Sequence, residues 1–162
     1  MSDRAMTQQL SLITLGVADL AATRAFYVDG LGWTPTLYVP GEVLFLQIGH
    51  GMLLSLWSRA EMDAEAGATA PAVGRDGSAP LTLGHLTDSP AEVDAVLAAA
   101  AAAGGAVLRS GRRRDWGGYS GYFTDPDGFR WEVAHNPGFV VGPDGSVQIG
   151  EVSNGPGETD GG

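Results

Sequence analysis

The sequence predicts an α+β fold in which two β-α-β-β-β modules curl into one half-barrel cup. The prediction rests on a repeated order of strand-like and helix-like segments, and on two glycine-containing turns that each lead into an apolar strand. The turns are Gly49-His50-Gly51 in the first half and Asp125-Pro126-Asp127-Gly128 in the second. Two similar halves within 162 residues indicate a pseudo-symmetric molecule with a site between them.

The first module begins with a strand and a capped helix. Asp19 is placed to cap the helix, and Leu20, Tyr27 and Leu31 are spaced to share one of its faces. Three strands then complete the module. The elements expected, in chain order, are a strand at 11–17, a helix at 20–29 and strands at 33–39, 43–48 and 52–57.

The second module repeats this order. Ser89 can cap a helix whose first residue is Pro90, and the alanine-rich stretch that follows is a strong helix former. The elements expected are a strand at 81–87, a helix from 90 to a stop at Gly104, strands at 106–109, 119–124 and 129–135, and a further short strand within 113–116. The predicted divisions are the first module at 9–58, a linker with one helical turn at 59–80, the second module at 81–136, and a C-terminal hairpin with a disordered tail at 137–162.

Composition narrows the possible functions. The chain has no cysteine and no lysine, which excludes thiolate and Schiff-base chemistry. Its formal net charge is −10 at pH 7, so we expect no nucleic-acid partner. The three arginines at 112–114 are interpreted as a solvated loop or edge strand rather than an anion clamp. Apolar stretches too short to cross a bilayer, and the absence of a signal-like opening segment, predict a cytoplasmic protein without a membrane partner.

Two longer stretches give the chain a family resemblance. Residues 17–33 contain Val-Ala-Asp-Leu and Phe-Tyr-Val-Asp-Gly-Leu-Gly-Trp, and residues 123–133 read Phe-Thr-Asp-Pro-Asp-Gly-Phe-Arg-Trp-Glu-Val. In this order, each in its own half, they resemble the vicinal oxygen chelate superfamily of glyoxalases, bleomycin-resistance proteins and extradiol dioxygenases. The resemblance covers residues 9–137. It implies a cup of paired modules and, in metal-dependent members, four His, Gln or Glu ligands around a divalent ion.

The ligand pattern that the resemblance implies is mostly absent. The first-strand positions of the two modules fall on Leu12 and Thr82, and the last-strand positions fall on Ser55 and Glu132. Only Glu132 keeps a ligand type. One carboxylate does not hold a catalytic metal, so we expect neither a metal nor another cofactor.

The histidines are not expected to replace the missing ligands. His50 lies in a predicted turn. His85 lies three residues beyond Thr82 and His135 three beyond Glu132, so strand alternation points both imidazoles to the opposite face. A structural role is therefore preferred for each.

Strand alternation also predicts the lining of the cup. If residues 125–128 form a four-residue turn, Tyr119 and Phe123 lie on the same side as Glu132, whereas Tyr122 lies on the core side. Together with a rim or lid at Trp116, this describes an aromatic cavity with few polar groups, as small-molecule sites are. The predicted ligand-binding residues are Ser55, Trp57, Thr82, Trp116, Tyr119, Phe123 and Glu132.

Glu132 is the candidate catalytic residue, and three roles stay open for it. It can act as a lone acid or base, form an ion pair with Arg114 or Arg130, or bind a cationic ligand beside the tryptophans. The preferred function is metal-free binding of a small hydrophobic or cationic molecule in the cup.

Two enzymatic functions are the alternatives. One is a divalent-metal lyase, isomerase or dioxygenase in which His85 or His135 joins Glu132 as a ligand. The other is a metal-independent enzyme that uses Glu132 as acid or base near Tyr119. Either a monomer or a homodimer is compatible with the sequence.

Overall fold

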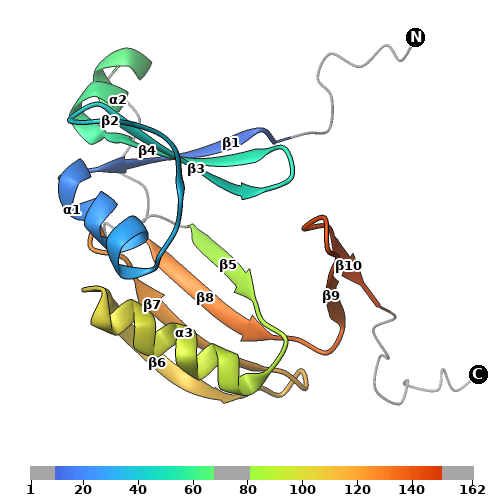
Figure 1. Cartoon of the computed structure of the whole chain (residues 1–162). Coiled ribbons are helices and arrows are strands. Elements are labelled where there is room, and N and C mark those ends of the chain that lie inside the picture. Colours follow the sequence, from blue (N-terminus) through green and yellow to red (C-terminus); the bar gives the residue numbers. More distant parts are fainter. Residues whose placement is uncertain (1–9, 68–80, 151–162) are drawn as a thin grey trace, which may run out of the picture.

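The computed structural model describes residues 10–67 and 81–150, and it consists of two four-stranded sheets, their helices and a short C-terminal hairpin (Figure 1). The predicted disordered tail lies outside these residues, as does most of the predicted linker. None of the helices within the described ranges is long and apolar enough to span a membrane.

The first half follows the predicted order. Its elements are β1 (Leu12–Val17), α1 (Leu20–Arg24), the π-helical turn η1 (Ala25–Gly30), β2 (Pro35–Val39), β3 (Val43–Gly49), β4 (Met52–Ser58) and α2 (Arg59–Ala66). The sheet order is β1-β4-β3-β2, with β1 parallel to β4 and the other pairs antiparallel. The carboxylate of Asp19 caps α1 by accepting from the backbone N–H groups of Ala21 and Ala22, as predicted.

The second half repeats this topology. Its elements are β5 (Thr82–Leu86), α3 (Pro90–Ala102), β6 (Ala106–Arg113), β7 (Tyr119–Thr124) and β8 (Arg130–His135), and the hairpin β9 (Phe139–Val141) and β10 (Val147–Ile149) follows. The sheet order is β5-β8-β7-β6, which matches the first sheet strand for strand. The predicted fold class of paired β-α-β-β-β modules is therefore confirmed.

The helix expected at 20–29 is present, and it changes from α to π at Ala25. One local prediction was wrong, because the two short strands expected between 106 and 116 form one strand, β6. The pairing of β6 with β7 shifts register twice, so the irregularity that suggested two strands is a pair of bulges in one.

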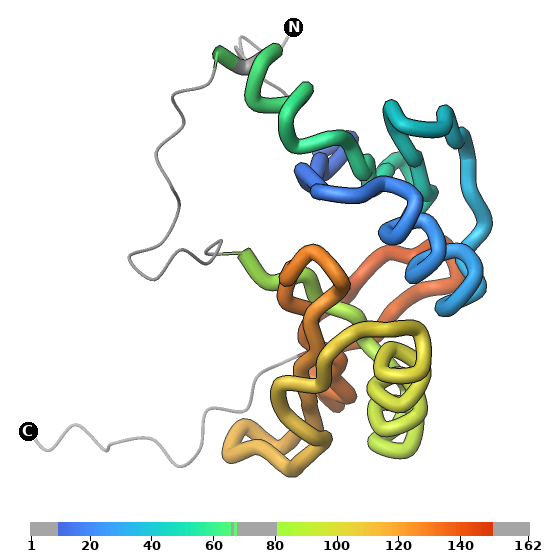
Figure 2. Tube along the Cα trace, turned by 90° about the vertical axis from the view of Figure 1, so that its left-hand side faces the viewer, coloured from blue at the N-terminus to red at the C-terminus, as the bar shows by residue number. Residues whose placement is uncertain are grey.

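The two halves share one core and meet through the sheet faces that carry the helices. The rings of Phe26 and Tyr27 from η1 lie 6.3 Å from Phe123 and 6.2 Å from Trp131, centroid to centroid. In Figures 1 and 2 the first half lies above the second, with α1 at their junction. Because these faces point toward each other, the opposite faces of the two sheets point away from the other half. That of the second sheet is helix-free, whereas α2 packs over one end of that of the first sheet, where Met62 lies beside Gly16.

The Asp-Pro-Asp-Gly turn joins the two halves. The carboxylate of Asp127 accepts from the backbone N–H of Ala18 at 2.9 Å and from the hydroxyl of Thr23 at 2.7 Å. Asp125 accepts from the hydroxyl of Tyr27 at 2.7 Å. The sequence predicted a turn rather than a catalytic pair here, and the structure agrees, because Gly128 adopts φ 87° and its N–H bonds the carbonyl of Asp125.

Candidate functional site

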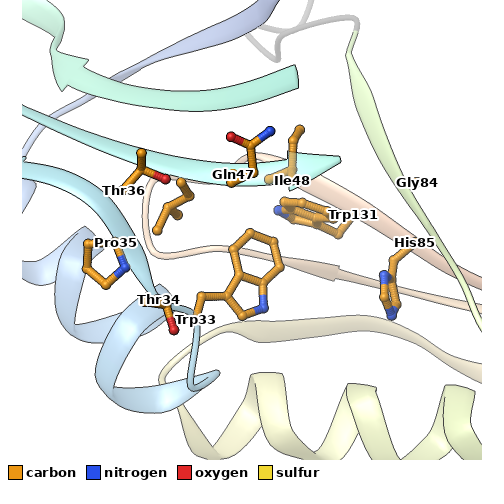
Figure 3. Close-up of a pocket in the computed structure, with 10 residues that line it drawn as sticks. Trp33, Thr34, Pro35, Thr36, Gln47, Ile48, Gly84, His85 and Trp131 are labelled. Atoms are coloured by element: carbon orange, nitrogen blue, oxygen red, sulfur yellow. The ribbon is translucent and has the colours of Figure 1, made fainter. Parts of the chain in front are cut away.

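An open cleft of about 650 Å³ lies between the two halves and is lined by residues of both (Figure 3). This volume is within the range of small-molecule sites, which is roughly 300–1,000 Å³. The first half contributes the β2 and β3 side and the second half contributes β5 and β8. The lining residues are Trp33, Thr34, Pro35, Thr36, Leu46, Gln47, Ile48, Gly84, His85 and Trp131.

Two tryptophans form the aromatic wall of the cleft. The rings of Trp33 and Trp131 meet edge to face, with centroids 5.9 Å apart and an interplanar angle of 83°. Trp33 also packs on Tyr27 at 5.3 Å. Such contacts between aromatic side chains add about 0.5–1.5 kcal/mol each to the burial of their area, so the wall is held in one geometry.

A buried chain of hydrogen bonds holds the indole ring of Trp131 in place. Its indole N–H donates to the hydroxyl of Tyr27 at 3.1 Å, and that hydroxyl donates to Asp125. Burial, and then the neighbouring Asp125 carboxylate, raise the pKa of Tyr27, so the phenol stays protonated. Burial also raises the pKa of Asp125, although donors from Tyr27 and from the backbone of Phe129 oppose this.

Polar groups of the cleft come from both halves. The polar side chains among the lining residues are those of Thr34, Thr36, Gln47 and His85. The Nε2 group of Gln47 already donates to the carbonyls of Gly49 and Met52. Desolvation at this position lowers the pKa of His85 below its ordinary 6.5, so its imidazole is neutral at pH 7. No carboxylate is among the lining residues in the described part of the chain. The cleft therefore suits an uncharged, flat ligand.

Glu132 lies elsewhere, on the helix-free face of the second sheet. Its carboxylate accepts a hydrogen bond of 2.8 Å from the hydroxyl of Tyr122, which lies directly opposite on β7. Burial and this hydrogen bond raise the pKa of Tyr122. Neither of the ion pairs found among the described residues involves Glu132, so the predicted pairing with Arg114 or Arg130 is replaced by the phenol.

The predicted faces of Tyr119, Phe123 and Tyr122 were wrong. Phe123 lies opposite Trp131 and is 3% exposed in the shared core, and the hydroxyl of Tyr119 bonds Asp94 of α3. The cause is the length of the turn between β7 and β8. Asp125 and Phe129 close a three-residue loop with a glycine in the left-handed conformation, one residue shorter than the loop assumed from the sequence. A shift of one residue reverses every side chain of a strand.

The other predicted site residues are not brought together around Glu132. Ser55 and Trp57 are on the face of the first sheet opposite α1, where Ser55 is 3% exposed and the indole N–H of Trp57 donates to Glu61 of α2 at 3.1 Å. Thr82 shares the face of Glu132 but is solvent-exposed. Trp116 is 51% exposed in the turn between β6 and β7.

The cleft residues were not foreseen as a site. Trp131 alternates with Glu132 along its strand, but nothing in the sequence shows that its face borders an opening between the halves. Trp33 follows a helix-terminating glycine and was assigned only to a strand. Their proximity depends on how the halves dock, which strand periodicity does not specify.

Comparison with known proteins places the fold in a family. A profile of the Glyoxalase/Bleomycin resistance protein/Dioxygenase superfamily matches residues 9–133. The chain belongs to this superfamily. No curated protein matches the chain at a significant level.

Several solved structures of the superfamily are similar. A glyoxalase-related enzyme from Fulvimarina pelagi is 36% identical with a TM-score of 0.80, and the match covers 90% of this chain and 100% of that one. A lactoylglutathione lyase from Agrobacterium tumefaciens is 28% identical with a TM-score of 0.61, covering 81% and 96%. A glyoxalase/bleomycin resistance protein/dioxygenase from Nocardioides is 25% identical with a TM-score of 0.63, covering 82% and 86%.

The metal site known from this superfamily can be tested against the side chains present. Leu12 and Ser55 lie on the outward face of the first sheet, and Thr82 and Glu132 on that of the second. His85 pairs with Val133 and His135 with Tyr119, so both imidazoles belong to the face opposite Glu132, as predicted. Within residues 10–67 and 81–150, no three His, Asp or Glu side chains are grouped closely enough to hold an ion. These residues do not fit a three-ligand metal site.

Proposed function

We propose that this superfamily member binds a small, flat, uncharged molecule in the cleft between its two sheets. The observation that supports this most is the fixed pair of Trp33 and Trp131 in an open space of about 650 Å³. A planar apolar ligand can pack on the half-buried Trp33 ring and displace water from the exposed Ile48. The neutral imidazole of His85 offers one hydrogen bond for orientation.

The proposal modifies the expectation drawn from the sequence in two respects. Binding is still to a small hydrophobic molecule without a metal, but the residues differ, because Trp33 and Trp131 replace Trp57 and Phe123. A cationic ligand is disfavoured, since no carboxylate lines the described cleft to compensate its charge.

The test is a titration of neutral aromatic compounds into the full chain, measured by isothermal titration calorimetry. Trp33→Leu removes half of the aromatic wall and should weaken Kd about tenfold, which is the loss of one aromatic contact of about 1.4 kcal/mol. Trp57→Leu is the matched control, because this tryptophan lies outside the cleft and should leave Kd unchanged. Equal affinities of both variants, or no binding across the panel, would contradict the proposal.

A second candidate function is acid–base catalysis by Glu132. The observation that favours it is the hydrogen bond of 2.8 Å between Tyr122 and Glu132, which couples a carboxylate to a phenol on an accessible face. S-Lactoylglutathione is one substrate to assay, because one similar structure is named as a lactoylglutathione lyase. Glu132→Gln should lower the turnover about 10²–10⁴-fold if the carboxylate transfers a proton. Unchanged turnover in Glu132→Gln would remove this candidate.

A further inference from the structure

Arginines are concentrated on the second sheet, although the whole chain is acidic. Five of the nine basic residues lie on β6, on β8 and in the turn after β6, in a chain of formal net charge −10. The strand pairing directs Arg109, Arg112 and Arg130 to the helix-free face of the second sheet, and Arg114 joins them there by its hydrogen bonds to Ser120. We name this set, Arg109, Arg112, Arg114 and Arg130, the arginine face.

Arg114 is held flat on this face. Its Nε donates to the hydroxyl of Ser120 at 2.8 Å, its Nη2 donates to the carbonyl of Ser120 at 3.1 Å, and its guanidinium carbon lies 5.6 Å from the centroid of the Tyr122 ring. These contacts use two of the five N–H donors that a guanidinium has. The others remain for a ligand in a position that needs no further ordering of the side chain.

Arg130 carries a hydrogen-bond donor that lacks an acceptor within the described residues. Its Nε is buried, and no hydrogen-bond partner for it is found among the described residues. An unsatisfied buried donor is costly and uncommon in folded proteins. Arg130 and Arg114 both act electrostatically on the Tyr122 hydroxyl, so the two guanidinium groups lie near the same phenol.

Protection of a sheet edge explains only part of the cluster. β6 is the edge strand, and charged side chains on an edge discourage pairing with other chains. This explains Arg112, but Arg130 lies on β8, which has a neighbouring strand on each side. Within residues 10–67 and 81–150, the ion pairs are formed by Arg24 and Arg59, so neutralisation by a neighbouring acid does not explain the arginine face either.

The charges on this face favour an anion. The face has four arginines, and Glu132 is the single acid that the strand pairing places beside them. The net charge of this group is therefore 4 − 1 = +3. Glu132 is already hydrogen-bonded to Tyr122, and so it orients the ring under Arg114. Guanidinium groups bind carboxylate and phosphoryl oxygens through paired, charge-assisted hydrogen bonds.

We infer that the arginine face is a binding site for the oxyanion group of a small molecule, either a carboxylate or a phosphoryl group, with Arg130 and Arg114 as its main donors. The unused N–H groups of Arg114, which lies over the Tyr122 ring, and the guanidinium of Arg130 supply the donors. The inference concerns a surface separate from the aromatic cleft and does not depend on occupation of the cleft.

The experiment uses the full chain and observes the arginine Nε–H signals by ¹⁵N NMR. Inorganic phosphate and malonate are titrated separately, with sodium chloride adjusted to keep the ionic strength constant. The expected result is a saturable shift of the Arg130 and Arg114 signals with at least one of the two anions. A response to phosphate alone assigns a phosphoryl group, a response to malonate alone assigns a carboxylate, and a response to both supports a general oxyanion site.

Variants make the assignment specific. Arg130→Gln should lower the affinity for the responding anion about tenfold or more. Arg112→Gln, at an exposed position, should lower this affinity about two- to threefold. Arg59→Gln, on α2 and in its own ion pair, is the control and should not change the affinity. If neither anion gives a saturable shift, or if folded Arg130→Gln and Arg112→Gln both bind like the unmodified chain, the inference is wrong. Trp33→Leu should keep anion binding, which separates this result from failure of the aromatic cleft.

Discussion

Replacement of Tyr27 by Phe tests the buried link between the halves. The Tyr27 side chain is fully buried, and its hydroxyl joins the indole N–H of Trp131 in the second half to the carboxylate of Asp125 in the connecting turn. Tyr27→Phe keeps the ring and its packing, so the substitution removes two hydrogen bonds and opens almost no cavity. The expected effect on stability is therefore almost entirely polar.

The magnitude follows from the groups left behind. The indole N–H of Trp131 loses its acceptor, at a cost of about 1–3 kcal/mol. The carboxylate of Asp125 is 3% exposed and keeps its bonds from the backbone N–H groups of Asp127 and Phe129, but loses its third donor. Because a hydrogen bond to a charged group contributes about 1.5–3 kcal/mol, we expect a total loss of about 3 kcal/mol. For a domain of this size that corresponds to a fall in Tm of roughly 6–12 °C.

The assay is urea unfolding at pH 7, followed by circular dichroism, with the m value checked for equality between the two proteins. Tyr119→Phe is the matched control, because its hydroxyl also bonds a carboxylate, that of Asp94, but at the exposed surface. Tyr119→Phe should lower the free energy of unfolding much less than Tyr27→Phe does. A loss in Tyr27→Phe no larger than that in Tyr119→Phe would refute the reasoning that the buried hydroxyl joins the halves.

Three further predictions concern pH, a helix cap and a close contact. Burial raises the pKa of Asp125 above its ordinary 3.8, so the contribution of the protonated Asp125 to stability is full below pH 3.8 and is lost as the pH rises through the folded-state pKa. The difference in unfolding free energy between the unmodified chain and Asp125→Asn, measured by urea titration, should therefore decline from pH 3 to 6. An increase of this difference over that range would contradict the prediction. Ser89→Ala removes the side-chain cap of α3 and should cost about 1 kcal/mol by the same assay, whereas no loss would show that the cap is dispensable. Gly121→Val places a Cβ 2.5 Å from Leu97 Cδ1 and should lower stability by about 1–3 kcal/mol, while Gly84→Ala, with no atom within 4 Å, should not; equal Tm values for the two would overturn the packing argument.

The candidate site was predictable only in part. Strand alternation correctly placed His85 and His135 opposite Glu132, since these residues lie on strands whose faces the apolar pattern fixes. It failed for Tyr122, whose face depends on the length of the turn after β7. The residues of that turn are compatible with loops of three or four residues, and only burial of Asp125 against Tyr27 selects the shorter one.

The sequence by itself determined the duplicated β-α-β-β-β order, the capped helices and the polar turn, because these follow from local periodicity and from the backbone preferences of Asp, Pro, Gly and Ser. Only the tertiary structure decided that Trp33 and Trp131 form one wall, that Tyr122 lies beside Glu132, and that four arginines gather on one sheet face. Those arrangements depend on strand register and on the docking of two halves. Both are set by contacts between residues about a hundred positions apart in the chain, which no local pattern records.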